Sequence, residues 1–71
     1  MTNQIPDTDL KALRKKLGLT QKEFAEKYHL SFQGVLKWEQ KKSKPSEAAK
    51  MLLFLIERIP HYIENELKKI V

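Results

Sequence analysis

Cysteine is absent from this chain of 71 residues, so neither a disulfide nor a thiolate metal site can stabilise its fold. The two histidines, His29 and His61, lie far apart and match no metal-ligand spacing. The longest apolar run covers only residues 51–56, whereas a transmembrane helix needs roughly 20 apolar residues. Residues 1–6 contain no basic region followed by an apolar stretch, which a secretory signal requires. We therefore expect a soluble cytoplasmic protein with no metal, no cofactor and no membrane partner.

Residues 20–28 carry a strong helix pattern. Thr20 is an N-cap residue, and Glu23, three positions later, completes a capping box in which each side chain binds the other residue's backbone amide. Phe24, Ala25 and Tyr28 fall on one side of the helix. This spacing predicts a short helix with a single buried face.

A second short helix is predicted directly after this one. Residues 29–30 form a tight turn, and Ser31 caps a helix over residues 32–40. At 100° per residue, Val35 and Trp38 point inward. The residues that point outward together are Gln33, Leu36, Lys37 and Gln40. Two helices joined in this way in a small basic domain favour a helix-turn-helix DNA binder.

Three further helices are predicted around this pair. Asp7 or Thr8 can cap a first helix that runs to about Leu17, after which Gly18 provides the stop. Ser46 caps a fourth helix over residues 47–59. That helix is apolar nearly all round at residues 51–56, so it must be covered on more than one side.

Pro60 ends the fourth helix and can open a fifth. No segment is predicted as a strand, so the fold class is all-α. The chain is one domain, with a tail at residues 1–6, a core at residues 7–59 and a C-terminal helix at residues 60–71.

Positive charge gathers next to the helix pair. Fourteen Lys and Arg residues against nine Asp and Glu residues give a net charge of +5, which favours polyanionic partners. Clusters at residues 11–16 and 41–44 flank the helix pair and can contact phosphates on both sides of it. The alternative is that both clusters are ordinary solvated surface. Lys68 and Lys69 are interpreted as complementing a helix C-terminus.

The pattern of residues 13–21, with Phe24-Ala25 and Trp38-Glu39, resembles the Cro/C1 (XRE) repressor family. The resemblance covers residues 9–59 and implies a compact five-helix, lambda-repressor-like DNA-binding domain. Two positions depart from the family pattern, because His29 and Lys41 stand where glycine is usual.

The resemblance also implies roles for individual residues. The positions that read bases in the major groove are Gln33 and Lys37, with Leu36, Phe32 and Gln40 beside them. The chemistry agrees, because a glutamine amide pairs with adenine and a lysine donates to guanine. For Phe32 packing against the second helix is an equal alternative, and for Leu36 the alternative is an isolated exposed leucine.

The phosphate contacts are expected at both ends of the helix pair, from Gln21, Lys22, Ser31, Lys42, Ser43 and Lys44. Arg14 and Glu39 are assigned to structure, because in similar domains this pair is a buried salt bridge between the first and third helices. Trp38 is likewise assigned to the core.

Residues 44–49 and the helix that enters at Pro60 are similar to HigA- and MqsA-type antitoxins. This similarity implies autoregulation of a toxin–antitoxin operon, with a RelE-like ribonuclease toxin as partner. Stand-alone regulators and phage repressors share the same layout, so the alternatives stay open.

A homodimer is expected, because Ile63, Leu67 and Ile70 form an apolar stripe on the last helix. Two subunits would then bind an inverted-repeat operator. The alternative is that the stripe folds back onto the first and fourth helices of the same chain.

Other functional classes fit less well. A protein-interaction module that has lost DNA binding would favour an acidic or apolar recognition face, unlike the face that carries Gln33 and Lys37. An RNA binder would need exposed stacking rings. An enzyme is not expected, because no catalytic constellation of side chains and no phosphate-binding glycine loop is present.

Overall fold

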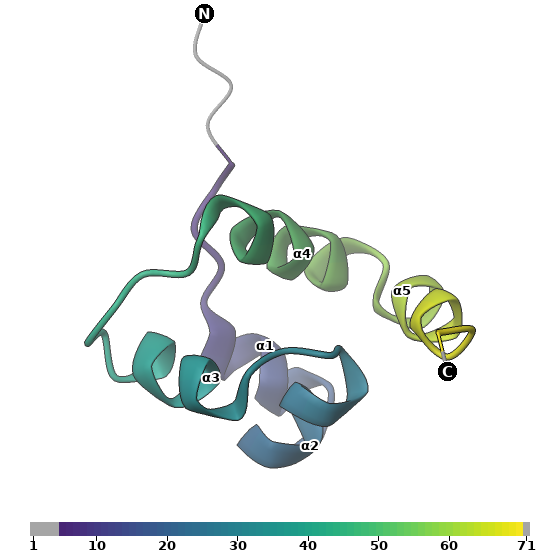
Figure 1. Cartoon of the computed structure of the whole chain (residues 1–71), viewed down its shortest axis with the longest axis horizontal. Coiled ribbons are helices and arrows are strands. Elements are labelled where there is room, and N and C mark those ends of the chain that lie inside the picture. The colour runs from purple at the N-terminus through teal and green to yellow at the C-terminus, as the bar shows by residue number, and fades with distance from the viewer. Residues whose placement is uncertain (1–4, 71) are drawn as a thin grey trace, which may run out of the picture.

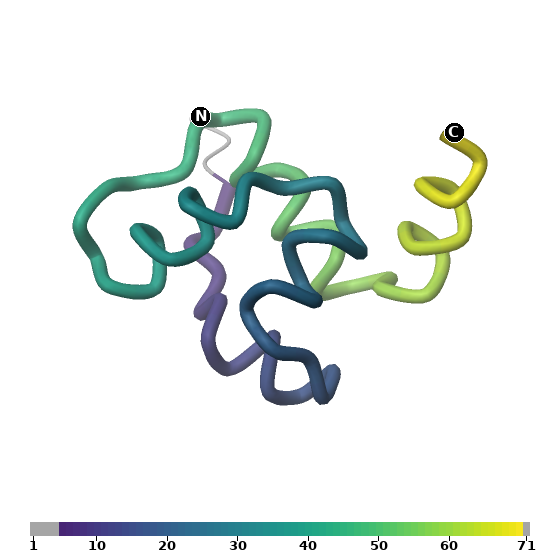
Figure 2. The backbone as a smooth tube through the Cα atoms, turned by 60° about the horizontal axis from the view of Figure 1, so that its bottom comes forward, coloured from purple at the N-terminus to yellow at the C-terminus, as the bar shows by residue number. Residues whose placement is uncertain are grey.

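The chain is described by a computed structural model over residues 5–70, and within that range it forms five α-helices and no strand. The helices are α1 (Leu10–Lys16), α2 (Gln21–Lys27), α3 (Phe32–Glu39), α4 (Glu47–Arg58) and α5 (Pro60–Leu67). Figure 1 shows α1, α2 and α3 grouped below α4, with α5 beyond the end of α4. The loop after α3 and helix α5 lie at opposite ends of the molecule, as Figure 2 also shows. The all-α prediction is confirmed, while most of the predicted tail lies outside the described residues.

Side-chain caps begin the first four helices. Thr20 accepts a hydrogen bond from the Glu23 amide at 3.1 Å, and the Glu23 carboxylate accepts one from the Thr20 amide at 2.9 Å. The predicted capping box is therefore present, and its two hydrogen bonds lower the pKa of Glu23. Ser31 and Ser46 cap α3 and α4 as predicted.

The predicted N-cap of the first helix is wrong, because the observed N-cap lies one residue after Thr8 and two after Asp7. Asp9, and neither Asp7 nor Thr8, accepts the hydrogen bond from the Ala12 amide, at 3.1 Å. Asp9 is the last polar residue before Leu10, which is only 5% exposed. Helix α1 therefore starts where its first buried side chain enters the core.

Three helices end with a residue in the left-handed conformation. Gly18, His29 and Lys41 have φ values of 72°, 57° and 61°. In each case the next amide donates to the carbonyl five residues earlier, from residues 19 to 14, 30 to 25 and 42 to 37, at 3.1, 2.9 and 2.9 Å. This is the Schellman hydrogen bond, which satisfies a free carbonyl at the helix end. Glycine suits the conformation best, histidine tolerates it, and lysine adopts it at a cost.

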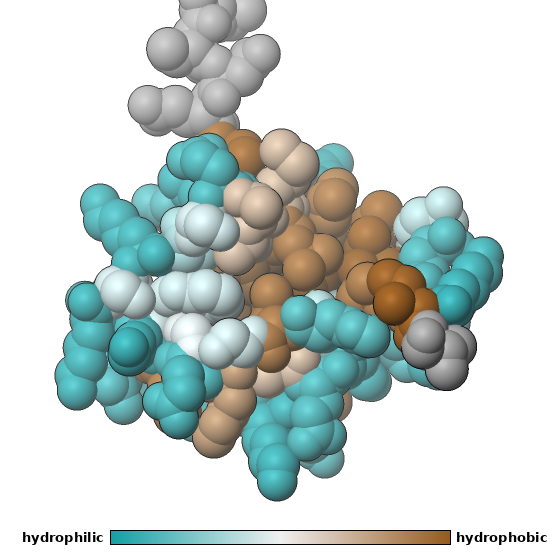
Figure 3. Space-filling model, viewed as in Figure 1, coloured by the Kyte–Doolittle hydropathy of each residue, from teal (hydrophilic) through white to brown (hydrophobic). Residues whose placement is uncertain are grey.

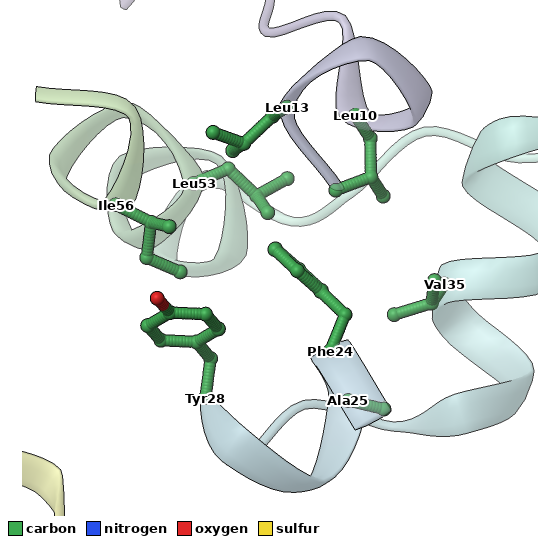
Figure 4. Packing of buried hydrophobic residues seen from close by; sticks show 8 residues of the cluster. All are labelled: Leu10, Leu13, Phe24, Ala25, Tyr28, Val35, Leu53 and Ile56. Carbon is green, nitrogen blue, oxygen red and sulfur yellow. The ribbon is translucent and has the colours of Figure 1, made fainter. Parts of the chain in front are cut away.

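The core is built around Phe24, which is fully buried (Figure 4). Its ring lies 5.0 Å from that of Tyr28, centroid to centroid. The other members of the core are Leu10 and Leu13 from α1, Ala25 from α2, Val35 from α3, and Leu53 and Ile56 from α4. Four helices thus share one core, which fixes the orientation of α3 against α2.

Helix α5 packs on its own chain. Ile63 and Leu67 are half-buried against the core, and Lys27 of α2 forms an ion pair with Glu64 at 3.5 Å. Glu64 also pairs with Lys68 at 3.2 Å, and this hydrogen bond is the main cause of its lowered pKa. Two of the three residues expected at a dimer interface therefore pack within the monomer, which agrees with the alternative that the stripe folds back on its own chain. The homodimer stays a prediction. Ile70 remains 63% exposed.

One face of α4 stays apolar and accessible. It carries Met51, which is 52% exposed, half-buried Leu52 and Leu55, and Ile59, which is 43% exposed. Met51, Leu55 and the C-cap residue Ile59 follow one another at four-residue steps, and Leu52 precedes Leu55 by three, so they share one side of the helix. We call them the α4 face. In Figure 3 apolar surface lies over much of α4 and continues to α5, whereas the surface below it is mainly teal and white, with a few brown residues among them.

The left-handed Lys41 generates a stability prediction. Lys41→Gly removes a strain of about 1–2 kcal/mol but adds unfolded-chain entropy worth about 0.4–1 kcal/mol. We expect the free energy of unfolding to rise by up to about 1.6 kcal/mol. Lys42→Gly is the matched control, because it removes the same charge at a residue without positive φ, and it should lower stability. Urea denaturation measures both, and equal losses in the two variants would contradict the assigned strain.

Candidate nucleic-acid interface

The outer side of α3 is free for contact. Gln33, Lys37 and Gln40 are exposed, Phe32 is 40% exposed, and Leu36 is half-buried. The predicted base-reading residues therefore lie on the solvent side of one helix. Leu36 and Phe32 flank the polar side chains, at the border between the outer side and the packed side.

The inner side of α3 is fully engaged. Val35 is completely buried, and it packs in the same core as Ala25, which is 3% exposed. Trp38 was expected in the core, and it is half-buried against the core instead of enclosed by it. A helix held on this side presents its outer residues in one orientation.

Gly34 packs tightly against the Trp38 ring. A Cβ atom on Gly34 would lie 3.0 Å from Cζ2 and 3.3 Å from Cη2 of that ring. The indole therefore leans over the α3 backbone one turn before its own residue. Sequence reasoning did not single out Gly34, although a glycine inside a helix, where it costs about 1 kcal/mol relative to alanine, is a signal of close packing.

A charged network joins α1, α2 and α3. Nε of Arg14 donates to Oε2 of Glu39 at 2.8 Å, and Nη2 donates to Oε1 at 3.1 Å. Nη1 of Arg14 donates to the Leu19 carbonyl at 3.1 Å. The side chains of Arg14 and Glu39 are 14% and 5% exposed. This two-pronged pair ties the end of α1 to the end of α3.

Gln21 takes part in the same network. Its Nε2 donates to Oε1 of Glu39 at 3.1 Å, so α2 is also linked to α3. This contact was not foreseen, because Gln21 was predicted to bind a phosphate. The amide has a second hydrogen and an oxygen, so the observed bond orients Gln21 and leaves it able to donate outward.

The network shifts the pKa values of both charged partners. Burial alone would raise the pKa of Glu39, but hydrogen bonds from Arg14 and Gln21, with the charges of Arg14 and Lys11, lower it overall. The hydrogen bond to Glu39 is the main cause of the raised pKa of Arg14. Both residues are therefore held in their charged forms.

The other predicted phosphate-binding residues surround α3. Lys22 on α2 and Lys42, Ser43 and Lys44 in the loop after α3 are all exposed. The Ser31 hydroxyl accepts a hydrogen bond from the Gly34 amide at 3.1 Å, and its own hydrogen stays available as a donor. The structure thus brings polar and basic groups to both ends of α3.

Within residues 5–70, no helix has the length and apolar character needed to cross a membrane. The same residues contain no group of three or more His, Cys, Asp or Glu side chains that could hold a metal ion.

Acid stability should depend on Glu39. Its folded pKa lies below the ordinary value, so its stabilisation is present above pH of about 4.3 and is lost as pH falls through the folded pKa. Glu39→Gln should lower the free energy of unfolding at pH 7 by about 1.5–3 kcal/mol. In this variant the free energy of unfolding should also decrease less steeply as the pH falls below about 4.3. Glu26→Gln is the control, because Glu26 is an exposed residue of α2. Urea titrations from pH 7 to pH 3 measure this, and equal profiles for the two variants would exclude the assignment.

The geometry described so far agrees with a comparison with known proteins. The sequence model of a protein family described as helix-turn-helix matches residues 10–49, which is more than half of the 71 residues. This range runs from the start of α1 into α4 and contains the whole charged network. A search of curated proteins gives no match. The chain belongs to the Cro/C1-type helix-turn-helix family of DNA-binding regulators.

Proposed function

We propose that the chain is a repressor that binds an inverted-repeat operator as a homodimer and reads bases with the outer side of α3. The observation that carries this proposal is the division of α3 into two sides. Val35 and Glu39 fix its inner side through the core and the Arg14 pair. Gln33 and Lys37 are exposed one turn apart on the other side.

The outer side chains have the chemistry for base recognition. Gln33 can pair with N6 and N7 of adenine, and Lys37 can donate to O6 and N7 of guanine. Leu36 and Phe32 border these groups and offer apolar contact to thymine methyls, and Gln40 extends the polar row by almost one turn. A helix with these residues fits the major groove, which is about 12 Å wide.

Phosphate contacts come from the surroundings of α3. Lys42, Ser43 and Lys44 would contact the backbone beyond the C-terminal end of α3, and Ser31 would contact it at the N-terminal end. Gln21 and Lys22 would contact it from the start of α2. Gln21 is held in place by its bond to Glu39, so the carboxylate orients this contact without touching DNA. A net charge of +5 would speed association with DNA.

The homodimer would form through the α4 face and Ile70, not through the whole stripe on α5. Ile63 and Leu67 already pack against the core, whereas Met51, Ile59 and Ile70 are exposed. A twofold axis through this surface would pair like with like. The two copies of α3 would then reach half-sites about 34 Å apart.

An antitoxin role is a narrower form of this proposal. It rests on the similarity of residues 44–60 to HigA- and MqsA-type proteins, which implies a RelE-like toxin as partner. A stable complex with a toxin encoded beside this gene would support that role. Purification of the regulator alone after co-expression would count against it.

The DNA-reading proposal predicts a division of labour among side chains. An operator is first selected from a random pool of duplexes, and affinity is then measured over a series of salt concentrations. Gln33→Ala and Lys37→Ala should each cost about 1–3 kcal/mol on the selected site. Lys42→Ala should weaken all sequences equally and reduce the salt slope by about 0.9. If about 4 phosphates are neutralised per subunit, the wild-type slope is near −3.6.

Lys69→Ala is the control for this series, because Lys69 is 71% exposed after α5 and is not assigned to the interface. Absence of binding at low salt, or a flat salt response, would reject the DNA proposal and favour a protein-interaction module.

The dimer proposal predicts different outcomes for two substitutions to aspartate. Met51→Asp should give a folded monomer, because Met51 is 52% exposed and touches the proposed interface. Leu67→Asp should destabilise the monomer itself, because Leu67 packs on the core. Sedimentation equilibrium and circular dichroism distinguish these results. A wild type that stays monomeric at high concentration would contradict the dimer.

A further inference from the structure

A pocket of about 480 Å³ lies between the segment before α1, the C-terminal end of α3 and the start of α4. Ligand pockets usually have volumes of roughly 300–1,000 Å³. Figures 1 and 2 show the loop after α3 arching outward at this end of the molecule. None of the five residues proposed to read bases lines the pocket, so its lining needs a separate explanation.

The apolar part of the lining contains a fixed aromatic ring. Trp38 lines the pocket together with Leu10, Leu53 and Pro45. The indole is half-buried against the core, and its benzo edge lies over Gly34. A planar group entering the pocket would meet a flat surface whose position is already set, which favours stacking.

More lysines than carboxylates of the pocket lining are left without an ion-pair partner of opposite charge. Four lysines and four carboxylates line the pocket: Lys11, Lys41, Lys44, Lys50, Asp7, Asp9, Glu39 and Glu47. Glu39 pairs with Arg14 at 2.8 Å, Asp7 pairs with Lys50 at 3.2 Å, and Asp9 caps α1. Among the described residues, no ion pair joins Lys11, Lys41 or Lys44 to a carboxylate. Three ammonium groups therefore remain against two carboxylates, that of Glu47 and that of Asp9, which keeps its charge while it caps α1.

Lys41 adds a second indication that positive charge matters here. It has φ of 61° at a position that favours glycine. A lysine in this conformation places an ammonium group at the pocket where the backbone would be better served by a residue without a side chain.

We propose that this pocket binds a small planar anion, an aromatic or heteroaromatic acid, whose ring stacks on Trp38. Its acid group would lie among the ammonium groups of Lys11, Lys41 and Lys44. The site lies beside the α3–α4 loop, and Lys44 and Ser43 line it as well. Since both residues are proposed to contact phosphates, the bound anion would lower the affinity for DNA. This coupling rests on the proposed function, whereas the binding itself does not.

The chain contains its own reporter, because Trp38 is the only tryptophan. Its indole N–H gives one side-chain signal in a nitrogen–proton correlation spectrum. The probe is 2-naphthoate, and the matched neutral control is 2-naphthalenemethanol. We expect a saturable shift of the Trp38 signal with 2-naphthoate, with a Kd of about 1 mM for a ligand of about 13 heavy atoms. The neutral alcohol should cause a much weaker shift.

Lysine variants test the position of the acid group. Lys11→Gln and Lys41→Gln should each weaken binding of 2-naphthoate about 2–5-fold. Lys16→Gln is the control, because Lys16 is exposed on the same helix as Lys11 but does not line the pocket. Any of three results would overturn the proposal: no saturable shift of Trp38, equal binding of the alcohol, or equal weakening by Lys16→Gln.

A second arm tests the coupling to DNA separately. Adding 2-naphthoate should raise the Kd for a selected duplex above the value in sodium chloride of equal ionic strength, and Lys11→Gln should reduce this effect. An unchanged Kd with intact naphthoate binding would reject the coupling and leave the site standing. A chain that binds naphthoate but no DNA would reject the proposed function alone.

Discussion

The ion pair between Arg14 and Glu39 is the contact on which the rest of the structure depends. Helices α1, α2 and α3 have only seven, seven and eight residues, which is too short for stability in isolation. Their mutual orientation must come from tertiary contacts. The apolar core allows small rotations, because dispersion and burial have little directionality. Two hydrogen bonds from one guanidinium to one carboxylate, with a third from Gln21, do have direction. They fix the end of α3 relative to both preceding helices.

The helix ends show a second constraint of the same kind. Each of the first three helices stops at a left-handed residue, and each stop turns the chain toward the next helix through one backbone hydrogen bond. Glycine fills only the first of these positions. At His29 the backbone accepts a modest strain within the turn that joins α2 and α3, and at Lys41 it accepts more. A strained residue persists only where the surroundings determine its conformation. Here the Lys42–Lys37 hydrogen bond and the packing of Trp38 provide that determination.

Features that depend on neighbouring residues in the chain could be predicted from the sequence. The capping box at Thr20 and Glu23, the stop at Gly18 and the helix that opens at Pro60 all follow from local chemistry, and the structure contains them. Features that depend on distant partners could not be predicted in the same way. Gln21 forms a hydrogen bond with Glu39, which is 18 residues away in the sequence. Leu67 packs against the core formed by the first four helices. An apolar stripe indicates that a face is buried, but it carries no information on which surface covers it. The prediction of the N-cap of α1 failed for a related reason. Asp7, Thr8 and Asp9 can all serve as N-cap residues, and only the burial of Leu10 selects Asp9.

The buried core occupies the middle of the molecule, so different surfaces remain exposed at its two ends. Every large side chain that is fully buried lies between the helices, namely Tyr28, Phe24, Ile56 and Val35. What remains at one end is α3 with its basic loop, and at the other end is α5, with the apolar α4 face beside it (Figures 2 and 3). A polyanion is attracted by charge and needs few apolar contacts, whereas a second subunit needs buried apolar area. Because the two surfaces do not overlap, binding at one end leaves the other end accessible. A dimer assembled through the apolar surface would therefore keep both copies of α3 free to reach successive major grooves, which is the geometric condition for an inverted-repeat operator.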